Sequence, residues 1–223
     1  GHPHLGKLMD SKILWVRDAE VMARLEDLRT RAASVLASEA RFSKAEEALG
    51  RAKYAFAECC LAESLSCARY HAAGVIYEGL SALMLSYGRY YRRGVKRTYE
   101  EVASAAPAWD VRGATDAVVL AETPETLREA LAAWLRDVRA HMAEPAQFVR
   151  SAPCRDNLAG AYEEMVSNWR SKMAEAAGRG DVFSSFMNLA SLQGMLDGIA
   201  SEVDVPAVDA MAGDDPRDLR KNA

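Results

Sequence analysis

The sequence predicts an all-α protein, a helical bundle of the up-down type. Half of its 223 residues are hydrophobic, and most apolar residues recur at the spacing of one helix face. Residues that favour helix starts precede several of these patterns, among them Asp18, Ser43 and Thr123. The length allows one large domain or two small ones, each with a sizeable core.

The first seventeen residues are the one exception to the helical pattern. Lys12 to Arg17 reads KILWVR, which is typical of a β-strand. A lone strand leaves its backbone groups without partners, so the run is either irregular or part of a sheet whose other strands lie upstream. We favour the second interpretation, because Asp18 caps a helix immediately. Residues 1–17 are then the remnant of, or the linker from, a missing upstream domain.

Three long helices are expected in the first half of the bundle, which spans residues 18–205 in all. The first carries an apolar stripe, and a capping box of Ser43 with Glu46 opens the second. The third runs from about residue 64 to Tyr87 and ends at Gly88, because glycine suits the position after a helix.

Shorter helices are expected in the second half. Thr98 with Glu101 forms another capping box, and Thr123 with Pro124 opens a helix that ends near Met142. The remaining helices are expected at 114–120, 156–178 and 181–200. Beyond these helices the chain turns polar, so residues 206–223 are expected to be a loose tail.

A short basic and aromatic segment follows the third helix. Residues 88–99 read GRYYRRGVKRTY in a chain whose net charge is −4. Its candidate ligand-binding residues are Arg89, Tyr90, Arg92, Arg93 and Lys96. Such a cluster on a rigid scaffold suits a nucleotide or another phosphate, although a solvated loop with ordinary surface charge is an equally good explanation.

The third helix is apolar on nearly every side, so its few polar residues are informative. His71 and Glu78 are seven residues apart and therefore share one face. They either line a polar ligand groove or form a structural pair. Metal ligation through Glu63, Cys67 and His71 is disfavoured, since three ligands on one straight helix converge poorly, and no metal site is predicted.

Composition indicates where such a protein works. No apolar run reaches the length of a membrane span, and the start lacks the apolar segment of a signal peptide. The four cysteines form no Cys-x-x-Cys pair, so reduced thiols and a cytoplasmic location are expected.

The stretch from Ala68 to Glu101, ARYHAAGVIYEGLSALMLSYGRYYRRGVKRTYEE, resembles a known family. It is similar to the helical C-terminal domain of aminoglycoside-type nucleotidyltransferases, to nucleotidyltransferase substrate-binding subunits and to HEPN domains. The later stretch from Tyr162, YEEMVSNWRSKMAEAAGRGDVFSSF, looks like the closing helices of such proteins. The resemblance implies binding of a small hydroxyl- or amine-bearing acceptor, near the phosphates of a nucleotide.

In that family a nucleotidyltransferase core precedes the helical domain. The core needs a Gly-Ser turn for the triphosphate and an Asp-x-Asp pair for Mg²⁺, and this sequence contains neither. We therefore expect no transfer by this chain alone and no cofactor on it. Mg²⁺ and ATP, or another nucleoside triphosphate, are implied only when a core is supplied in cis or in trans.

The resemblance also suggests a general base. In the kanamycin-modifying members a glutamate of the helical domain activates the acceptor hydroxyl. The best-matched positions are Glu47 and Glu46, and Glu47 is preferred because Glu46 already belongs to a capping box.

Two alternatives remain open. HEPN ribonucleases use an Arg-x4–6-His motif, which Arg136 and His141 satisfy. Those ribonucleases pair two motifs in a dimer, so a homodimer belongs to this alternative. The other alternative is a structural helical interaction module.

Overall fold

The computed structural model describes residues 9–10, 12–16, 18–91, 97–145 and 150–212. These residues form nine α-helices and one π-helical segment, so the predicted all-α class is confirmed. Contacts divide the chain into two compact units, Gly1–Ala146 and Gln147–Ala223. The predicted C-terminal boundary of the bundle is at residue 205, so the division at 146 differs from the prediction.

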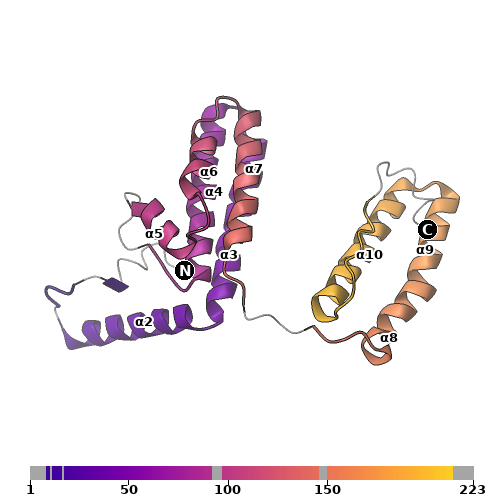
Figure 1. Cartoon of the computed structure of the whole chain (residues 1–223), viewed down its shortest axis with the longest axis horizontal. Helices are drawn as coiled ribbons and strands as arrows, with labels where there is room; N and C mark the ends of the chain where they lie inside the picture. Colours follow the sequence, from indigo (N-terminus) through magenta and orange to yellow (C-terminus); the bar gives the residue numbers. More distant parts are fainter. Residues whose placement is uncertain (1–8, 11, 17, 92–96, 146–149, 213–223) are drawn as a thin grey trace. The chain divides into compact units, whose positions relative to one another are not determined.

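The first unit is built around an antiparallel pair of long helices. α3 (Ala40–Leu61) and α4 (Leu65–Ser86) pack along their length, and α7 (Pro124–His141) packs against α4. α6 (Val111–Val119) lies against α7, and α5 (Thr98–Ala105) joins α4 to α6. Figure 1 shows α3, α4, α6 and α7 side by side.

Helix α2 (Ala19–Ala37) extends away from this bundle and meets it near its own C-terminal end (Figure 1). The Asp18 carboxylate accepts a hydrogen bond from the Val21 N–H (2.9 Å), so the predicted cap is formed. Leu36 is the one buried residue of α2, whereas Val21 and Leu28 remain about half exposed.

The β-like segment before α2 is not a strand. The described residues 12–16 have no regular secondary structure, and Leu14 and Trp15 are 94% and 79% exposed. The strand prediction is therefore wrong for these residues. The physical reason is that no neighbouring strand is described that would pair with their backbone groups.

Close packing of α4 against α7 centres on a tryptophan. Trp134 is 1% exposed, its Nε1–H donates to Thr115 Oγ1 (3.1 Å), and its ring lies 5.9 Å from that of Trp109. A Cβ added at Gly79 would lie 2.6 Å from Trp134 Cζ3. Glycine therefore allows α4 to approach the indole ring. Most of the rest of this core is aliphatic, with Leu49, Val75, Leu83, Leu127, Leu131 and Val138 among its members.

One predicted capping box does not form. α3 begins at Ala40, so Ser43 lies inside the helix rather than before it. The pattern misplaced this start because backbone hydrogen bonds upstream, such as Arg41 N–H to Ser38 O, extend the turn. α5 begins at Thr98, where the sequence predicted a helix start, and the capping box of Thr98 with Glu101 stays a prediction.

The second unit contains two antiparallel helical arms. The helix expected at 156–178 is interrupted: α8 (Arg155–Glu163) passes into π-helix η2 (Glu164–Trp169) and then α9 (Arg170–Arg179). α10 (Val182–Glu202) returns along α9, after the Asp181 carboxylate accepts the Ser184 N–H.

Two sets of hydrogen bonds close this unit. Ser151 forms an isolated parallel bridge with Val203, so the beginning and the end of the unit are tied together. The Gln193 side chain bonds Val208 O (2.9 Å) and Ala210 N–H (2.6 Å). Residues 208–210, which were expected to belong to a loose tail, are thus held against α10.

Candidate functional site

The chain leaves α4 in a direction that a glycine determines. Gly88 has φ of 66°, its N–H donates to Leu85 O, and the Arg89 N–H donates to Met84 O, each at 2.8 Å. This hydrogen-bond pattern is a Schellman motif. A Cβ at Gly88 would lie 2.4 Å from Leu36 O, so a larger residue is excluded on two grounds.

The beginning of the basic segment is held to the first unit. Arg89 Nη1 donates to both the carbonyl oxygen (3.0 Å) and the hydroxyl (2.9 Å) of Ser104, near the end of α5. The Tyr90 hydroxyl donates to Asp10 Oδ1 (3.1 Å). These two candidate residues therefore have structural partners. Arg92, Arg93 and Lys96 lie outside the described residues.

Tyr91 is partly buried, and its hydroxyl oxygen is fully buried. Its hydroxyl has no hydrogen-bond partner among the described residues. Burial, with smaller contributions from Glu101 and Tyr77, raises the pKa of Tyr91 far above its ordinary value. The side chain therefore serves as an apolar anchor that packs against the core, before the cationic positions follow.

His71 and Glu78 of α4 lie on a half-open face. His71 is half-buried, and its ring meets the edge of Tyr70 at 5.4 Å. Glu78, 23% exposed, accepts from Arg51 on α3, with Nη2 and Nε at 2.8 and 2.9 Å. Neither residue is sealed in the core, and Glu78 pairs with Arg51 rather than with His71.

Sequence reasoning missed Arg51, the partner that decides the charge of this face. The signal was indirect: α3 and α4 are joined by only three residues, so they form an antiparallel pair and bring positions 51 and 78 together. Because the guanidinium balances the carboxylate, the face offers hydrogen-bonding groups and little net charge.

The two candidate general bases are both paired with cations. Glu46 forms an ion pair with Arg139 of α7, and Glu47 Oε1 lies 2.6 Å from Lys44 Nζ. The hydrogen bond from Lys44 lowers the pKa of the exposed Glu47. A lower pKa makes a weaker base, so the contact with Lys44 makes Glu47 less suited to proton abstraction.

The proposed ribonuclease pair is not assembled within one chain. Five residues along an α-helix separate Arg136 and His141 by about 140° around its axis. The His141 ring stacks on Trp109 (5.5 Å), and its Nδ1 lies 2.8 Å from Asp137 O. Arg136 is exposed on another side of α7.

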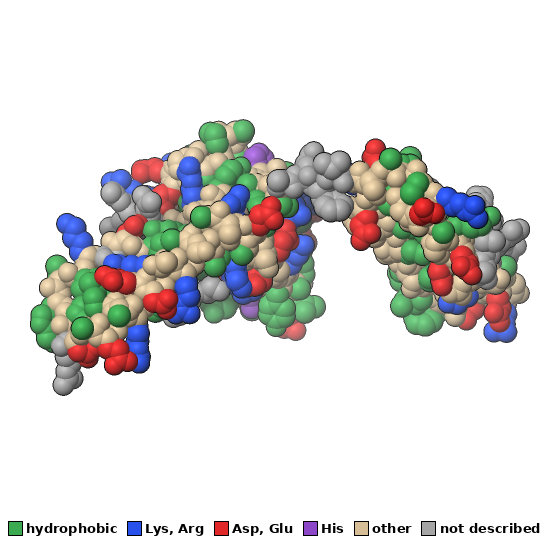
Figure 2. All heavy atoms as spheres, turned by 90° about the horizontal axis from the view of Figure 1, so that it is seen from below, with side chains coloured by type: hydrophobic (Ala, Val, Ile, Leu, Met, Phe, Trp, Pro, Cys, Tyr) green, Lys and Arg blue, Asp and Glu red, His purple; other side chains and the backbone are tan. Residues whose placement is uncertain are grey.

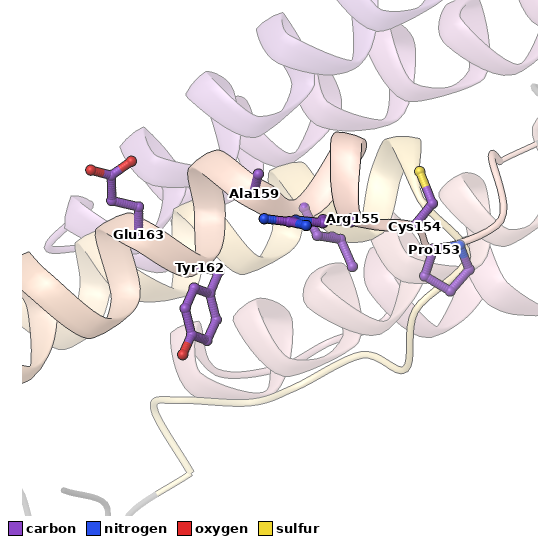
Figure 3. Close-up of a pocket in the computed structure, with 7 residues that line it drawn as sticks. Pro153, Cys154, Arg155, Ala159, Tyr162 and Glu163 are labelled. Carbon is purple, nitrogen blue, oxygen red and sulfur yellow. The ribbon is translucent and has the colours of Figure 1, made fainter.

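A shallow hollow of about 690 Å³ lies along α8 in the second unit (Figure 3). Its lining residues are Pro153, Cys154, Arg155, Leu158, Ala159, Tyr162 and Glu163. All of them belong to α8 or to the two residues before it, so no second element of this unit closes the hollow. The sequence contained no signal for this feature.

Neither a metal site nor a membrane-spanning helix is present in the part of the chain that the structure describes. No group of three or more His, Cys, Asp or Glu side chains within the described ranges is arranged to hold a metal ion. In the same ranges, no helix combines the length and the apolar composition that crossing a bilayer requires.

Comparison of the chain with protein-family models, with curated proteins and with solved structures gave no match.

Proposed function

We propose that this chain is the acceptor-binding helical domain of a nucleotidyltransferase-like protein, with transfer chemistry supplied by a catalytic core in cis or in trans. The observation that carries the proposal is the continuity of α4 with the basic segment. One face of α4 bears His71 and Glu78, and the basic segment begins at Gly88, directly after the C-cap of the same helix.

Each part of this arrangement suits one part of the substrate pair. His71 and the Arg51–Glu78 pair present donors and acceptors on a half-open face, which fits hydroxyl or amine groups of a small acceptor. The cationic residues that follow Tyr91 fit nucleotide phosphates. Mg²⁺ and the nucleoside triphosphate belong to the core in this proposal.

The pairing of Glu78 with Arg51 indicates which kind of acceptor this face would bind. A polycationic acceptor gains little from a carboxylate that Arg51 already neutralises. Recognition would then rest on hydrogen bonds, so a neutral polyol is expected to bind about as well as an amine of the same shape.

The test measures binding of ATP or inorganic polyphosphate by calorimetry. The double variant Arg92→Ala with Arg93→Ala should weaken binding, and added salt should weaken it further, because exposed charges are screened. The matched control removes two exposed arginines of α2, Arg24 and Arg31, each of which has an i,i+4 ion pair. If both double variants lose the same amount of affinity, the loss is due to the change in net charge alone, and the proposed phosphate site is refuted.

A second experiment tests adenylyl transfer with and without a catalytic core. The purified chain with Mg²⁺, ATP and a panel of aminoglycosides should give no adenylylated product, whereas addition of an intact core should allow transfer. Product from the chain alone would overturn the proposed division of labour.

The ribonuclease alternative is tested with the same protein. Metal-independent cleavage of RNA that His141→Ala abolishes would establish it. If neither the wild type nor His141→Ala degrades RNA while both are folded, the ribonuclease alternative is rejected.

A further inference from the structure

Helix α10 is apolar and yet largely uncovered. It contains no lysine or arginine, and no charged residue occurs from Val182 to Leu196. Only Ser185 and Leu189 of this helix are buried. Hydrophobic side chains accordingly gather on the surface of the second unit (Figure 2). A helix of this composition normally packs against another element.

Along one exposed face of α10, large side chains lie toward the N-terminal end and small residues toward the C-terminal end. The α10 stripe consists of Phe183, Met187, Ala190, Gly194 and Gly198, which share a face because they are spaced by three or four residues. Phe183 is 74% and Met187 is 47% exposed. A Cβ added at either glycine would meet nothing within 4 Å. One half of the stripe therefore projects, whereas the other half is flat and open.

Such a face is complementary to itself when a second copy runs antiparallel. With a two-fold axis near Ala190, Phe183 lies opposite Gly198 of the second copy, and Met187 opposite its Gly194. Each large side chain then enters the space above a glycine, and the same two contacts occur twice, as an isologous interface requires. We propose that the α10 stripe is a homodimer interface, in which two copies of α10 pack antiparallel.

A parallel pair fits the stripe less well. It would set Phe183 against Phe183 and glycine against glycine, which leaves steric overlap at one end and a void at the other. It would also bring Asp197 and Glu202 of one copy close to the same acids of the other, whereas the antiparallel pair keeps the acids of the two copies at opposite ends of the interface.

The available area sets the strength of the dimer. Burying the stripe and its flanking Val182 and Phe186, which are 45% and 47% exposed, removes on the order of 1,000 Å² from water over both copies. This is near the lower limit for a specific interface. We therefore expect a reversible dimer whose population depends on protein concentration.

The first test uses a substitution that cannot disturb the monomer. Gly194→Leu places a side chain in open space and favours the helix, but it fills the site that Met187 of the second copy needs. Sedimentation or light scattering should show the wild type approaching twice 24.4 kDa as concentration rises. Gly194→Leu should raise the dissociation constant at least about tenfold, because it removes the contact of Gly194 with Met187 at both of its symmetry-related positions.

The matched control is Gly160→Leu on α8, where a Cβ also meets nothing within 4 Å. This variant should dimerise like the wild type. A wild type that stays at 24.4 kDa at all concentrations would refute the interface, and so would a Gly194→Leu variant that dimerises like the control. The first unit of the same chain, or another protein, would then cover the stripe.

A size exchange tests the antiparallel register. Gly194→Met puts two large residues opposite each other, and Met187→Ala leaves a gap, so each variant alone should dimerise poorly. Mixed together, they should form a heterodimer, because the methionine introduced in one copy meets the alanine introduced in the other. Native mass spectrometry resolves the species, and a mixture that behaves like its separate components would refute the register.

This proposal and the proposed function fail independently. The stripe contains none of the residues assigned to acceptor or phosphate binding. A monomeric chain that binds ATP through the basic segment would reject only the dimer, and a dimer without ligand binding would reject only the proposed function.

Discussion

Substituting alanine for Gly79 tests whether the contact between α4 and α7 is as close as the structure indicates. The added methyl group would lie 2.6 and 2.8 Å from two carbons of the Trp134 ring. Both distances are far below van der Waals contact. The ring has little freedom to yield, because it is 1% exposed and its Nε1–H donates to Thr115.

The change in the free energy of unfolding is the sum of one stabilising and two destabilising contributions. Replacing glycine by alanine inside a helix gains about 1 kcal/mol of helix propensity. Overpacking a well-filled core costs about 1–3 kcal/mol, and displacing the indole from Thr115 costs about 1 kcal/mol more. The free energy of unfolding of Gly79→Ala should therefore fall by about 1–3 kcal/mol.

Gly74 provides a matched control on the same helix. A Cβ at Gly74 would lie 3.6 Å from Ala55 Cβ, which is ordinary contact. Gly74→Ala should therefore keep the propensity gain and stabilise the first unit by up to about 1 kcal/mol.

Urea titration followed by tryptophan fluorescence measures both variants, because Trp109 and Trp134 are buried and report on this core. Hydrogen exchange of the α4 amides assigns the change to the first unit. If Gly79→Ala is as stable as Gly74→Ala, the close contact is wrong and α7 lies farther from α4 than described.

Three further predictions concern other positions. Gly88→Ala should destabilise the first unit by more than about 2 kcal/mol in the same titration, since it combines a positive φ with a clash against Leu36. Tyr91→Phe removes a buried hydroxyl that has no hydrogen-bond partner among the described residues, and it should stabilise the first unit by up to about 1 kcal/mol. Folding raises the pKa of Tyr91, so above the pKa of about 10 in the unfolded chain only the unfolded chain loses this proton, and the folded state is destabilised. The free energy of unfolding should therefore fall less steeply at alkaline pH in Tyr91→Phe than in the wild type. Hydrogen bonds from Ser184 lower the pKa of Asp181, so the cap of α10 should weaken as pH falls below about 4. Amide hydrogen exchange in the first turn of α10 should then become faster at low pH in the wild type relative to Asp181→Asn, in which the cap does not titrate.

Helix positions followed from local patterns where a specific residue marks an end. Asp18, Thr123 and Asp181 cap their helices as predicted, and Gly88 follows α4. These signals work because a capping residue contacts backbone groups within three or four positions of itself.

Capping patterns failed where the backbone had another way to begin a helix. Ser43 and Glu46 match a capping box, but α3 already begins at Ala40. The KILWVR run matches a strand, but a strand exists only with a neighbour, and its described residues have none. Local preference yields in both cases to contacts beyond the local segment.

At the candidate site, the sequence predicted which residues share a face but not which residues they pair with. The sequence indicated that His71 and Glu78 share one face of α4, since helical spacing alone determines this. It did not indicate that Arg51 neutralises Glu78, that Arg139 pairs with Glu46, or that Ser104 holds Arg89. Each of these partners comes from a different helix.

The sequence by itself thus determined the all-α class, most helix ends and the residues that share each helix face, because these depend on neighbours a few positions away. Only the tertiary structure decided which charges are balanced, which glycine admits Trp134, and that α10 keeps an open stripe. Those outcomes depend on the packing of helices far apart in the chain, where a shift of a few ångströms changes a residue's partner.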